Sequence, residues 1–555
     1  MEDNTIDKYK EHNLLRKKHT DAILDSESKK RIIIAGPGTG KSFLFQEICK
    51  KNIKNGKTKN LTLSFINELV DDLTKDLHQL SEVKTLHSFA LSFMGKDAKI
   101  FLNLGKIIEE DLEIIKEEKA DYNAIFSNLL DEKEKLDFYS KRRKYYNFFS
   151  PNCSVYTLIK IFENEIKNVP EYSQILIDEF QDFNKLESKL LDYLSTKNPI
   201  LIAGDDDQSL YQFKHANPKD IRNKYNSDEF ESFQLPFCSR CTEVIIKAFN
   251  EILTVSKSKG FLLERTLKDY KYFPTLEKDE VSNLNNKISI KKNVYQKVVA
   301  FNIDKEIKKA FDPRKITPSV LIICPLKSQI ADLEKKLREK GYKNIDSYQK
   351  NENNEILDGL NLIIEDSNCN LGWRITSRYL YKIKNKESDF NEILKKSFSS
   401  GKKIIDLINF EDKKHIKKMV TLLRKVKNEN PITKDELEEL ANFINYNINE
   451  IVINKINNDI DNVHRTKNIY KNTNIKITTI LGSKGLTRDY VFLVNFDDKY
   501  ILEKNNNEFN ATNTNICQFL VSITRARIRN YIFTGENKIP TFVKWMNRDS
   551  YEEIE

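Results

Sequence analysis

A glycine-rich segment near the N-terminus has the residue types and spacing that hold a phosphate. Residues 35–42 read Ala-Gly-Pro-Gly-Thr-Gly-Lys-Ser, between an apolar run and a helical pattern. Glycines permit a tight turn whose N–H groups point at a phosphate, and the next helix adds its positive dipole end. A flexible glycine-rich turn is the alternative. We expect a nucleotide-phosphate site made by Gly36, Pro37, Gly38, Thr39, Gly40, Lys41 and Ser42.

Within this site each polar side chain has an expected role. Lys41 is expected to reach the β- and γ-phosphates, and the Ser42 hydroxyl to hold Mg²⁺. Such a site also needs a carboxylate for the metal, and residues 174–179 supply one with the run Gln-Ile-Leu-Ile-Asp-Glu. Asp178 is expected to bind Mg²⁺ directly or through water, and Glu179 to orient and deprotonate the attacking water. Alone, an apolar run ending in Asp-Glu is as consistent with a plain strand end, so the assignment depends on the glycine-rich segment.

The elements that must position these residues follow from the apolar pattern. Short apolar runs bounded by Gly, Asp or Pro are typical of buried parallel strands, and helical patterns such as Ser328–Lys340 lie between them. The alternation predicts an α/β protein with parallel sheets flanked by helices. The runs are residues 31–35, 61–65, 174–177, 199–203, 319–324, 476–480 and 490–494.

Two helix-rich stretches interrupt this alternation. Residues 91–170 and 346–474 are charged and carry amphipathic patterns. Far more residues separate Lys41 from Asp178 than the roughly 30 of one βαβ unit, so a segment must be inserted between them. We expect both stretches to be inserted helical subdomains; ordinary surface helices of the core are the alternative.

Composition excludes several classes of protein. The chain has 555 residues, 39% hydrophobic and 32% charged, which is enough apolar surface for several cores. No apolar run approaches the ~18–20 residues of a membrane span, and the polar N-terminus does not fit a secretory signal. Seven scattered cysteines argue against a disulfide scaffold and favour a cytoplasmic location. The net charge of +9 permits an anionic partner.

Further motifs, in this order, resemble those of the UvrD/Rep/PcrA-type superfamily 1 DNA helicases. They are Thr85-Leu-His87-Ser-Phe89, Asp178-Glu-Phe-Gln-Asp182, Gly204-Asp-Asp-Asp-Gln208-Ser-Leu-Tyr211, Gly482-Ser-Lys-Gly485-Leu486 and Val521-Ser-Ile-Thr-Arg525. The resemblance implies two RecA-like P-loop domains, each with a mainly helical insertion. It places the first domain at residues 1–90 and 171–234 and the second at 235–345 and 475–545. It also implies ATP-driven movement along single-stranded DNA, usually 3′ to 5′.

The resemblance assigns further residues to the nucleotide. Gln208 of the first domain and Arg240 and Arg525 of the second are expected at the γ-phosphate, so that hydrolysis requires the cleft between the domains to close. A surface salt bridge is the alternative for either arginine. Gly485 is expected beside the nucleotide, and His19 stands where the family has a glutamine that reads adenine.

Three residues depart from the family pattern around the base. Besides His19, Ser239 replaces an aromatic residue that stacks on adenine, and Thr487 replaces a glutamate. A histidine ring can bond one edge of adenine but cannot mimic a carboxamide. Phe237 is a candidate for the missing stack. The hypothesis is relaxed base selectivity, with GTP or CTP hydrolysed at rates near that of ATP.

The resemblance also predicts a track for single-stranded DNA. Stacking of bases on aromatic rings tolerates any sequence, so we expect binding that depends on strand form. Core packing is the alternative for each aromatic residue, and the lysine-rich run 402–427 is either a duplex-facing patch or a solvated helix face. The expected DNA contacts are Phe65, Asn67, Thr85, His87, Tyr211, Phe213 and Lys214.

Two functions remain open at this point. The first is an ATP- and Mg²⁺-dependent translocase that unwinds duplex DNA at single/double-strand junctions, in DNA repair or phage defence. The second is an ATP-regulated binding module that controls a partner nuclease without processive unwinding. Strand displacement by the isolated chain separates the two. RNA is a weaker alternative substrate.

Overall fold

The computed structural model describes residues 2–64, 67–211, 215–266, 268–310, 318–347, 355–444, 469–506 and 508–555. The chain divides into two compact units. The first comprises Met1–Phe89, Leu158–Gln349 and Asn468–Glu555, and the second comprises Ala90–Thr157 and Lys350–Lys467. No helix of the described residues is long and apolar enough to cross a membrane.

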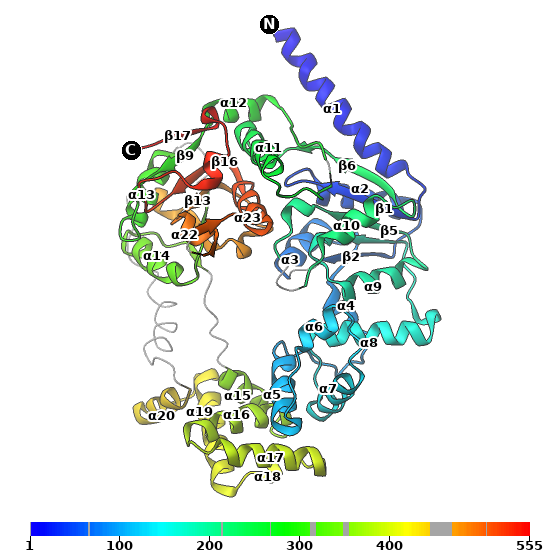
Figure 1. The fold of residues 1–555 in the computed structure, drawn as a ribbon, viewed down its shortest axis with the longest axis vertical. Helices are drawn as coiled ribbons and strands as arrows, with labels where there is room; N and C mark the ends of the chain where they lie inside the picture. Colours follow the sequence, from blue (N-terminus) through cyan, green and yellow to red (C-terminus); the bar gives the residue numbers. More distant parts are fainter. Residues whose placement is uncertain are drawn as a thin grey trace. The chain divides into compact units, whose positions relative to one another are not determined.

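The first unit contains a six-stranded parallel sheet in the order β3-β2-β4-β5-β1-β6 (Figure 1). A hydrophobic cluster packs Phe45 of α2 and Leu73 of α3 against Ile33 and Leu176 of the sheet. We call this sheet and its helices the first lobe. Its strands are β1 (Lys30–Ala35), β2 (Asn60–Ser64), β3 (Glu82–Thr85), β4 (Gln174–Ile177), β5 (Ile200–Gly204) and β6 (Glu231–Leu235). Its helices include α1 (Glu2–Asp25), α2 (Lys41–Lys54), α3 (Asn67–Asp76), α4 (Leu86–Leu91), α8 (Pro151–Asn164), α9 (Lys185–Ser195) and α10 (Pro218–Tyr225).

A second parallel sheet has seven strands in the order β11-β12-β10-β13-β16-β9-β17. Successive residues of β10 alternate between its two faces: Ile322 packs with α13 and α14, and Leu321 packs with α11 and α23. We call this sheet and its helices the second lobe. Its strands are β9 (Ile288–Lys291), β10 (Ser319–Cys324), β11 (Ile345–Ser347), β12 (Asn474–Thr479), β13 (Arg488–Leu493), β16 (Ala526–Phe533) and β17 (Tyr551–Glu553). Its helices are α11 (Glu243–Ser258), α12 (Leu276–Leu284), α13 (Val299–Ala310), α14 (Ser328–Glu339), α22 (Asp498–Ile501), α23 (Asn513–Ile523) and α24 (Thr541–Lys544).

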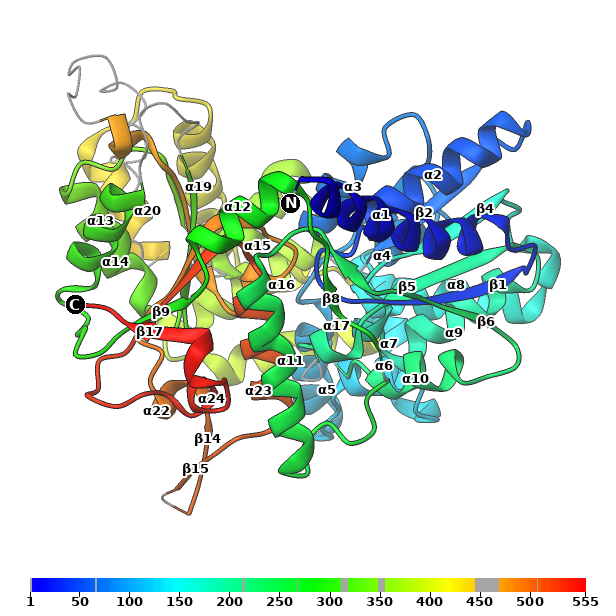
Figure 2. The same ribbon diagram turned by 90° about the horizontal axis from the view of Figure 1, so that it is seen from above.

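Smaller elements complete the first unit. The two-residue strands β7 (Phe237–Cys238) and β8 (Lys271–Tyr272) pair in parallel, and β14 (Glu503–Asn505) forms a hairpin with β15 (Glu508–Asn510). Helix α1 lies along β6 and contacts α2 (Figure 2). Both sheets are parallel and flanked by helices, which confirms the predicted α/β fold class. Each predicted apolar run forms a strand whose ends lie within two residues of the expected ones.

The two helical stretches pack against each other in the second unit. On α5, Asp111 is fully buried, and its carboxylate accepts hydrogen bonds from Arg142 of α7 and Arg374 of α16. The division between the units falls within α8, between Thr157 and Leu158. The helices of this unit are α5 (Leu104–Lys116), α6 (Tyr122–Ser127), α7 (Lys133–Tyr146), α15 (Glu355–Glu365), α16 (Asn370–Ile383), α17 (Glu387–Ser400), α18 (Ile404–Leu407), α19 (Phe410–Lys427) and α20 (Lys434–Ile444).

Candidate nucleotide-binding site

The glycine-rich loop joins the end of β1 to the start of α2, at the carboxyl edge of the first sheet. Gly38 and Gly40 have φ values of +70° and +96°, in the left-handed region that favours glycine. A Cβ atom on Gly38 would lie 2.3 Å from Cβ of Arg240, so only glycine fits beside that arginine. The loop therefore has the turn and the helix N-terminus that a phosphate site needs.

Lys41 lies between the two acids that follow β4. Its Nζ is 2.7 Å from Oε1 of Glu179 and 3.6 Å from Oδ1 of Asp178. Burial raises the pKa of Asp178, and Lys41 opposes that rise. Ser42 is the second residue of α2 and lines the same cleft as Asp178. A hydroxyl and a carboxylate are the hard oxygen ligands that Mg²⁺ prefers, so these two residues fit the expected metal.

Glu179 is held in an unusual backbone conformation, with φ of 52°. Its carboxylate accepts a 2.6 Å hydrogen bond from Nε2 of Gln181. The side-chain oxygen Oε1 of Gln181 in turn accepts a 2.9 Å hydrogen bond from the backbone N–H of Asp205. Burial alone would raise the pKa of Glu179, but Lys41 and Lys484 lower it below its ordinary value. The carboxylate is therefore ionised and aimed, as a general base requires. The sequence motif includes Gln181, but this linking role is not predictable from the motif alone.

Gln208 connects the two lobes through its side-chain amide. Its Nε2 donates to Asp205 at 2.6 Å, and its Oε1 accepts from Nη2 of Arg525 at 3.1 Å. Arg525 is 3% exposed and also donates from Nε to the Val521 carbonyl. Burial and the neighbouring Arg240 lower the pKa of Arg525 to about 10, which leaves it charged at neutral pH. No carboxylate of the described residues forms an ion pair with this buried guanidinium, which is suited to receive a phosphate.

Arg240 lines the same cleft, close to Gly38 of the loop. The Ser239 N–H donates to the Gly38 carbonyl at 3.0 Å, while Cys238 and Cys241 pack in the hydrophobic cluster of the second lobe. Residues of both lobes thus line one cleft of about 460 Å³. The residues that line it beyond 36–42 include Asp178, Glu179, Gln208, Ser239, Arg240, Gly485, Thr487 and Arg525.

Lys484 is a further buried cation near Glu179, and the sequence assigned no role to it. Its Nζ donates to the Gln208 carbonyl at 2.9 Å, pairs with Asp182 and lies 3.8 Å from Glu179. Burial raises the pKa of Asp182 to about 6, against the pull of Lys484. The second lobe therefore contacts the end of β4 through this lysine as well as through Arg525.

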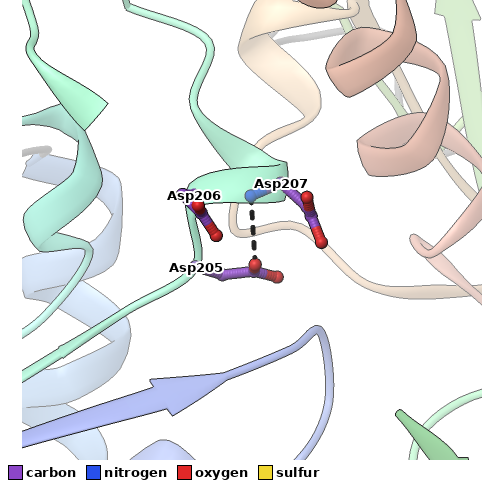
Figure 3. Close-up of side chains that lie close together, drawn as sticks. All are labelled: Asp205, Asp206 and Asp207. Atoms are coloured by element: carbon purple, nitrogen blue, oxygen red, sulfur yellow. Dashed lines mark hydrogen bonds between the residues drawn. The ribbon is translucent and has the colours of Figure 1, made fainter. Parts of the chain in front are cut away.

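The acidic triplet before Gln208 is neutralised by the chain itself. Asp205, Asp206 and Asp207 lie close together on and before a 3₁₀ turn, where the Asp207 N–H donates to Asp205 at 3.1 Å (Figure 3). Arg222 binds Asp206 at 2.7 Å, Arg265 binds Asp207 through two 2.9 Å hydrogen bonds, and Lys268 pairs with Asp205 and Asp207. Three basic side chains thus bind the three acidic ones. The triplet holds the turn that carries Gln208, and each of its acids has a basic partner among the described residues.

His19 lies in a smaller pocket that adjoins the phosphate cleft. Its ring meets Phe237 edge-on at 6.0 Å between centroids. Arg16 and Phe43 line this pocket too, and neither was singled out from the sequence. Ser239 lines the phosphate cleft and donates to the Gly38 carbonyl at 3.3 Å, so it lies beside the loop and does not line the smaller pocket.

The expected DNA contacts are only partly described. Thr85 accepts a hydrogen bond from the Ser88 N–H at 3.1 Å, and Nε2 of His87 is 3.6 Å from Glu187. Tyr211 is 9% exposed within the second lobe's hydrophobic cluster, which favours the packing alternative for that ring. Asn67 is the first residue of α3. Phe65, Phe213 and Lys214 lie outside the described residues.

The lysine-rich run 402–427 corresponds largely to α19. Two of its lysines are paired with acids of α20: Lys418 with Glu439 at 2.6 Å and Lys425 with Glu436 at 2.8 Å. These pairs favour a solvated helix face over a free basic patch.

Comparison with known proteins gives matches to helicases. A family model described as "AAA domain" matches residues 19–214. The chain is 33% identical over 99 residues to DNA helicase II of Haemophilus influenzae, which is 17% of this chain and 14% of that protein. It is 42% identical over 69 residues to an ATP-dependent helicase/nuclease subunit of Clostridium acetobutylicum, covering 12% of this chain and 6% of the relative.

A longer match covers more of the chain at lower identity. It is to a probable DNA helicase II homolog of Mycoplasma genitalium, 22% identical over 256 residues, or 43% of this chain and 35% of the relative. The chain thus aligns with about a third or less of the length of each of these relatives. Together these matches confirm the resemblance of this chain to the UvrD/Rep/PcrA-type DNA helicases.

Proposed function

We propose that this chain is a DNA-dependent nucleoside triphosphatase that moves along single-stranded DNA and unwinds duplexes at single/double-strand junctions. The observation that carries the proposal is the hydrogen bond from Arg525 of the second lobe to Gln208 of the first. It lies in the cleft that also holds Lys41 and Glu179. Residues from both lobes therefore surround the place where a γ-phosphate would lie.

The geometry supports a specific order of events. Lys41 exchanges its contact with Glu179 for the incoming β- and γ-phosphates. Glu179, freed from Lys41 but still held by Gln181, orients the attacking water and takes its proton. Arg240 and Arg525 neutralise the charge that builds on the transferring phosphoryl group. Mg²⁺, bound by Ser42 and Asp178, would supply charge neutralisation at the phosphates.

Release of phosphate removes the group that both arginines contact. Because Arg525 belongs to the second lobe and Gln208 to the first, we expect that loss to alter how the lobes contact each other and to drive a step along DNA. The direction we propose is 3′ to 5′, and the setting DNA repair or phage defence.

The experiment is a hydrolysis assay with no nucleic acid, single-stranded DNA, duplex DNA and single-stranded RNA in parallel. We expect the largest stimulation with single-stranded DNA. Equal rates of hydrolysis in all four conditions would contradict the proposal. Stimulation by RNA alone would show that the chain acts on RNA and not on DNA.

A second candidate function draws on the relatives named as helicase/nuclease subunits. In it the nucleotide cycle controls assembly with a partner nuclease, without processive unwinding. Strand displacement of a tailed duplex separates the two candidates: DNA-stimulated hydrolysis without displacement by the isolated chain would favour the partner-controlling module.

A further inference from the structure

Two of the seven cysteines lie on either side of the Ser239-Arg240 dipeptide. Cys238 ends β7, and Cys241 directly precedes Thr242, the N-cap residue of α11. Both cysteines are completely buried, and both are free thiols. A Cys-x-x-Cys sequence at the start of a helix is the arrangement in which thiol–disulfide oxidoreductases interconvert a dithiol and a disulfide. The spacing therefore permits a disulfide bond between these two residues.

The two sulfur atoms are in contact and differ in protonation. Burial alone would raise the pKa of the Cys238 thiol, but hydrogen bonds from the side chain and the backbone N–H of Cys241 lower it to about 5. The hydrogen bond between the side chains, together with burial, raises the pKa of Cys241 well above its ordinary value. At neutral pH the pair therefore holds a thiolate on Cys238 and a thiol on Cys241. A thiolate is the nucleophilic form of cysteine and the form that peroxides oxidise.

Positive charge surrounds this pair. Nζ of Lys278 donates to the Cys241 carbonyl at 2.9 Å and lies 3.5 Å from the Cys238 carbonyl. The start of α11 adds the positive end of a helix dipole beside Cys241. Both effects favour a thiolate over a thiol. The arrangement is that of the reduced form of a disulfide site, with a nucleophilic sulfur and a second sulfur next to it.

A disulfide here would act on both arginines of the cleft. It would close a ring around Arg240, because that residue lies between the two cysteines, and its S–S bond of about 2.05 Å would draw the two sulfurs together. It would also remove the thiol of Cys241, whose Sγ donates to the Thr524 carbonyl at 3.6 Å. Thr524 directly precedes Arg525. Oxidation therefore restrains the first arginine and removes a contact beside the second.

The nucleotide cleft gives a small oxidant access to this pair. A Cβ atom on Gly38 would lie 3.2 Å from Sγ of Cys238, and Gly38 lines the cleft of about 460 Å³. The sulfur of Cys238 thus lies directly behind the glycine-rich loop. Because both cysteines are completely buried, the oxidant must be small, and hydrogen peroxide is of the right size.

We propose that Cys238 and Cys241 are a redox-modification site, at which hydrogen peroxide forms a disulfide that restrains Arg240 and slows nucleotide hydrolysis. The effect on the rate rests on the proposed function, whereas formation of the disulfide does not. The site makes the proposed hydrolysis sensitive to oxidation, a form of regulation that operates through the second lobe.

The chemistry takes two steps. The Cys238 thiolate attacks one oxygen of hydrogen peroxide, the O–O bond breaks, and hydroxide leaves a sulfenic acid on Cys238. The Cys241 sulfur then attacks the Cys238 sulfur, the S–O bond breaks, and the departing hydroxide takes the Cys241 proton as water. The two sulfurs lose two electrons in total, and the peroxide gains them. A dithiol reductant reverses the modification by thiol–disulfide exchange.

The first test detects the disulfide in the native chain. After treatment with hydrogen peroxide, remaining thiols are alkylated and the chain is digested with trypsin, which cleaves after Arg240, between the two cysteines. We expect peptides 225–240 and 241–247 to be joined by a disulfide, with loss of two of the seven thiols. Recovery of the two peptides unlinked would overturn the proposal.

The second test measures the effect on turnover. We expect kcat of DNA-stimulated hydrolysis to fall roughly tenfold or more on oxidation, because Arg240 is restrained, and to return after treatment with dithiothreitol. Cys238→Ser leaves only the thiol of high pKa, so its turnover should resist peroxide. Cys324→Ser, at a buried cysteine of β10 in the same lobe, is the matched control and should lose turnover as the unchanged chain does.

The two tests separate this proposal from the proposed function. Linked peptides from a chain that hydrolyses no triphosphate even when reduced would refute the hydrolysis and support the modification site. Linked peptides with unchanged turnover would overturn the regulation of hydrolysis by this site. Equal loss of turnover in Cys238→Ser and in the unchanged chain would show that peroxide acts elsewhere, and the proposal would be wrong.

Discussion

At the scale of single residues, the catalytic assignment depends on charges that are buried and yet ionised. Lys41 contacts both Glu179 and Asp178, and Arg525 contacts Gln208, all within one cleft. The low pKa of Glu179 means that it is deprotonated throughout the neutral range. Each of these groups can be changed alone, with a distinct expected result.

Glu179→Gln should abolish turnover while leaving the fold intact, because the amide keeps the shape of the side chain but cannot take a proton. The expected loss in kcat is about 10²–10⁴-fold. The measurement is DNA-stimulated hydrolysis, with the exposed Glu171→Gln as control. Turnover within threefold of the unchanged chain would remove Glu179 from the role of base.

Arg525→Ala should remove the charge that stabilises the transferring phosphoryl group. We expect kcat to fall by roughly 10³-fold or more, while nucleotide binding weakens far less. Arg525→Lys should recover only part of the rate, because an ammonium group does not present the planar, paired N–H donors of a guanidinium. The exposed Arg548→Ala serves as control, and a loss confined to nucleotide affinity would contradict the assignment.

At the scale of elements, the 3₁₀ turn that carries Gln208 is held by residues that lie outside the 204–211 motif. Lys268 pairs with Asp205 and Asp207, and Arg265 binds Asp207 through both oxygens. Removing one partner of such a buried group leaves charge uncompensated, at a cost of ~3–5 kcal/mol. The position of Gln208 should therefore depend on a segment some 60 residues further along the chain.

Lys268→Met is the variant that tests this clamp. We expect kcat to fall at least tenfold with a smaller change in KM, because Gln208 is displaced while the glycine-rich loop is untouched. Lys271→Met, three residues on and exposed in its pair with Asp269, is the matched control. Equal rates for the two variants would show that the clamp has no influence on catalysis.

The packing of the two helical stretches depends on another buried charge. Burial alone would raise the pKa of Asp111, but Arg142 and Arg374 lower it. A carboxyl with a lowered pKa stabilises the fold above its ordinary value of about 4, and that contribution is lost as the pH falls through the folded value. The helical unit should therefore be destabilised by acid.

Asp111→Asn should lose the same stabilisation at neutral pH, by about 3–5 kcal/mol. Amide hydrogen exchange in α5, α7 and α16 measures this loss of stability locally. A global unfolding curve would combine the unfolding of both units. Glu113→Gln, exposed on the same helix, is the control. Unchanged protection in α7 and α16 of the Asp111→Asn variant would show that the network does not hold the stretches together.

At the scale of the whole molecule, local patterns in the sequence predicted the strands and the phosphate loop. The apolar runs at β1, β4 and β10 predicted buried strands correctly, because a strand of a parallel sheet covered by helices on both faces is apolar on both sides. The strand β16 was missed because its first five residues, Ala-Arg-Ile-Arg-Asn, alternate apolar and polar residues and resemble an exposed edge strand. The resemblance to helicases supplied Gln208 and Arg525, which no local pattern singles out.

What the sequence could not predict depends on contacts between distant segments. The buried Arg374–Asp111 pair joins residues more than 250 positions apart, so the common packing of the two stretches left no local signal. Arg16 and Phe43 were passed over because each is an ordinary helical residue until the fold brings them to one pocket. Tyr211 matched a DNA-contact motif, but its burial beside Lys484 emerges only in the folded chain.

The central claim is that hydrolysis in this cleft moves the chain along single-stranded DNA, and translocation kinetics test it most directly. DNA strands of increasing length carry a fluorophore at one end, and arrival of the chain changes its emission after nucleotide is added. The account predicts an arrival time that grows linearly with length for label at the 5′ end, and no arrival with Arg525→Ala. If DNA stimulates hydrolysis but the arrival time does not depend on strand length, whether the label is at the 5′ or the 3′ end, the central claim is contradicted.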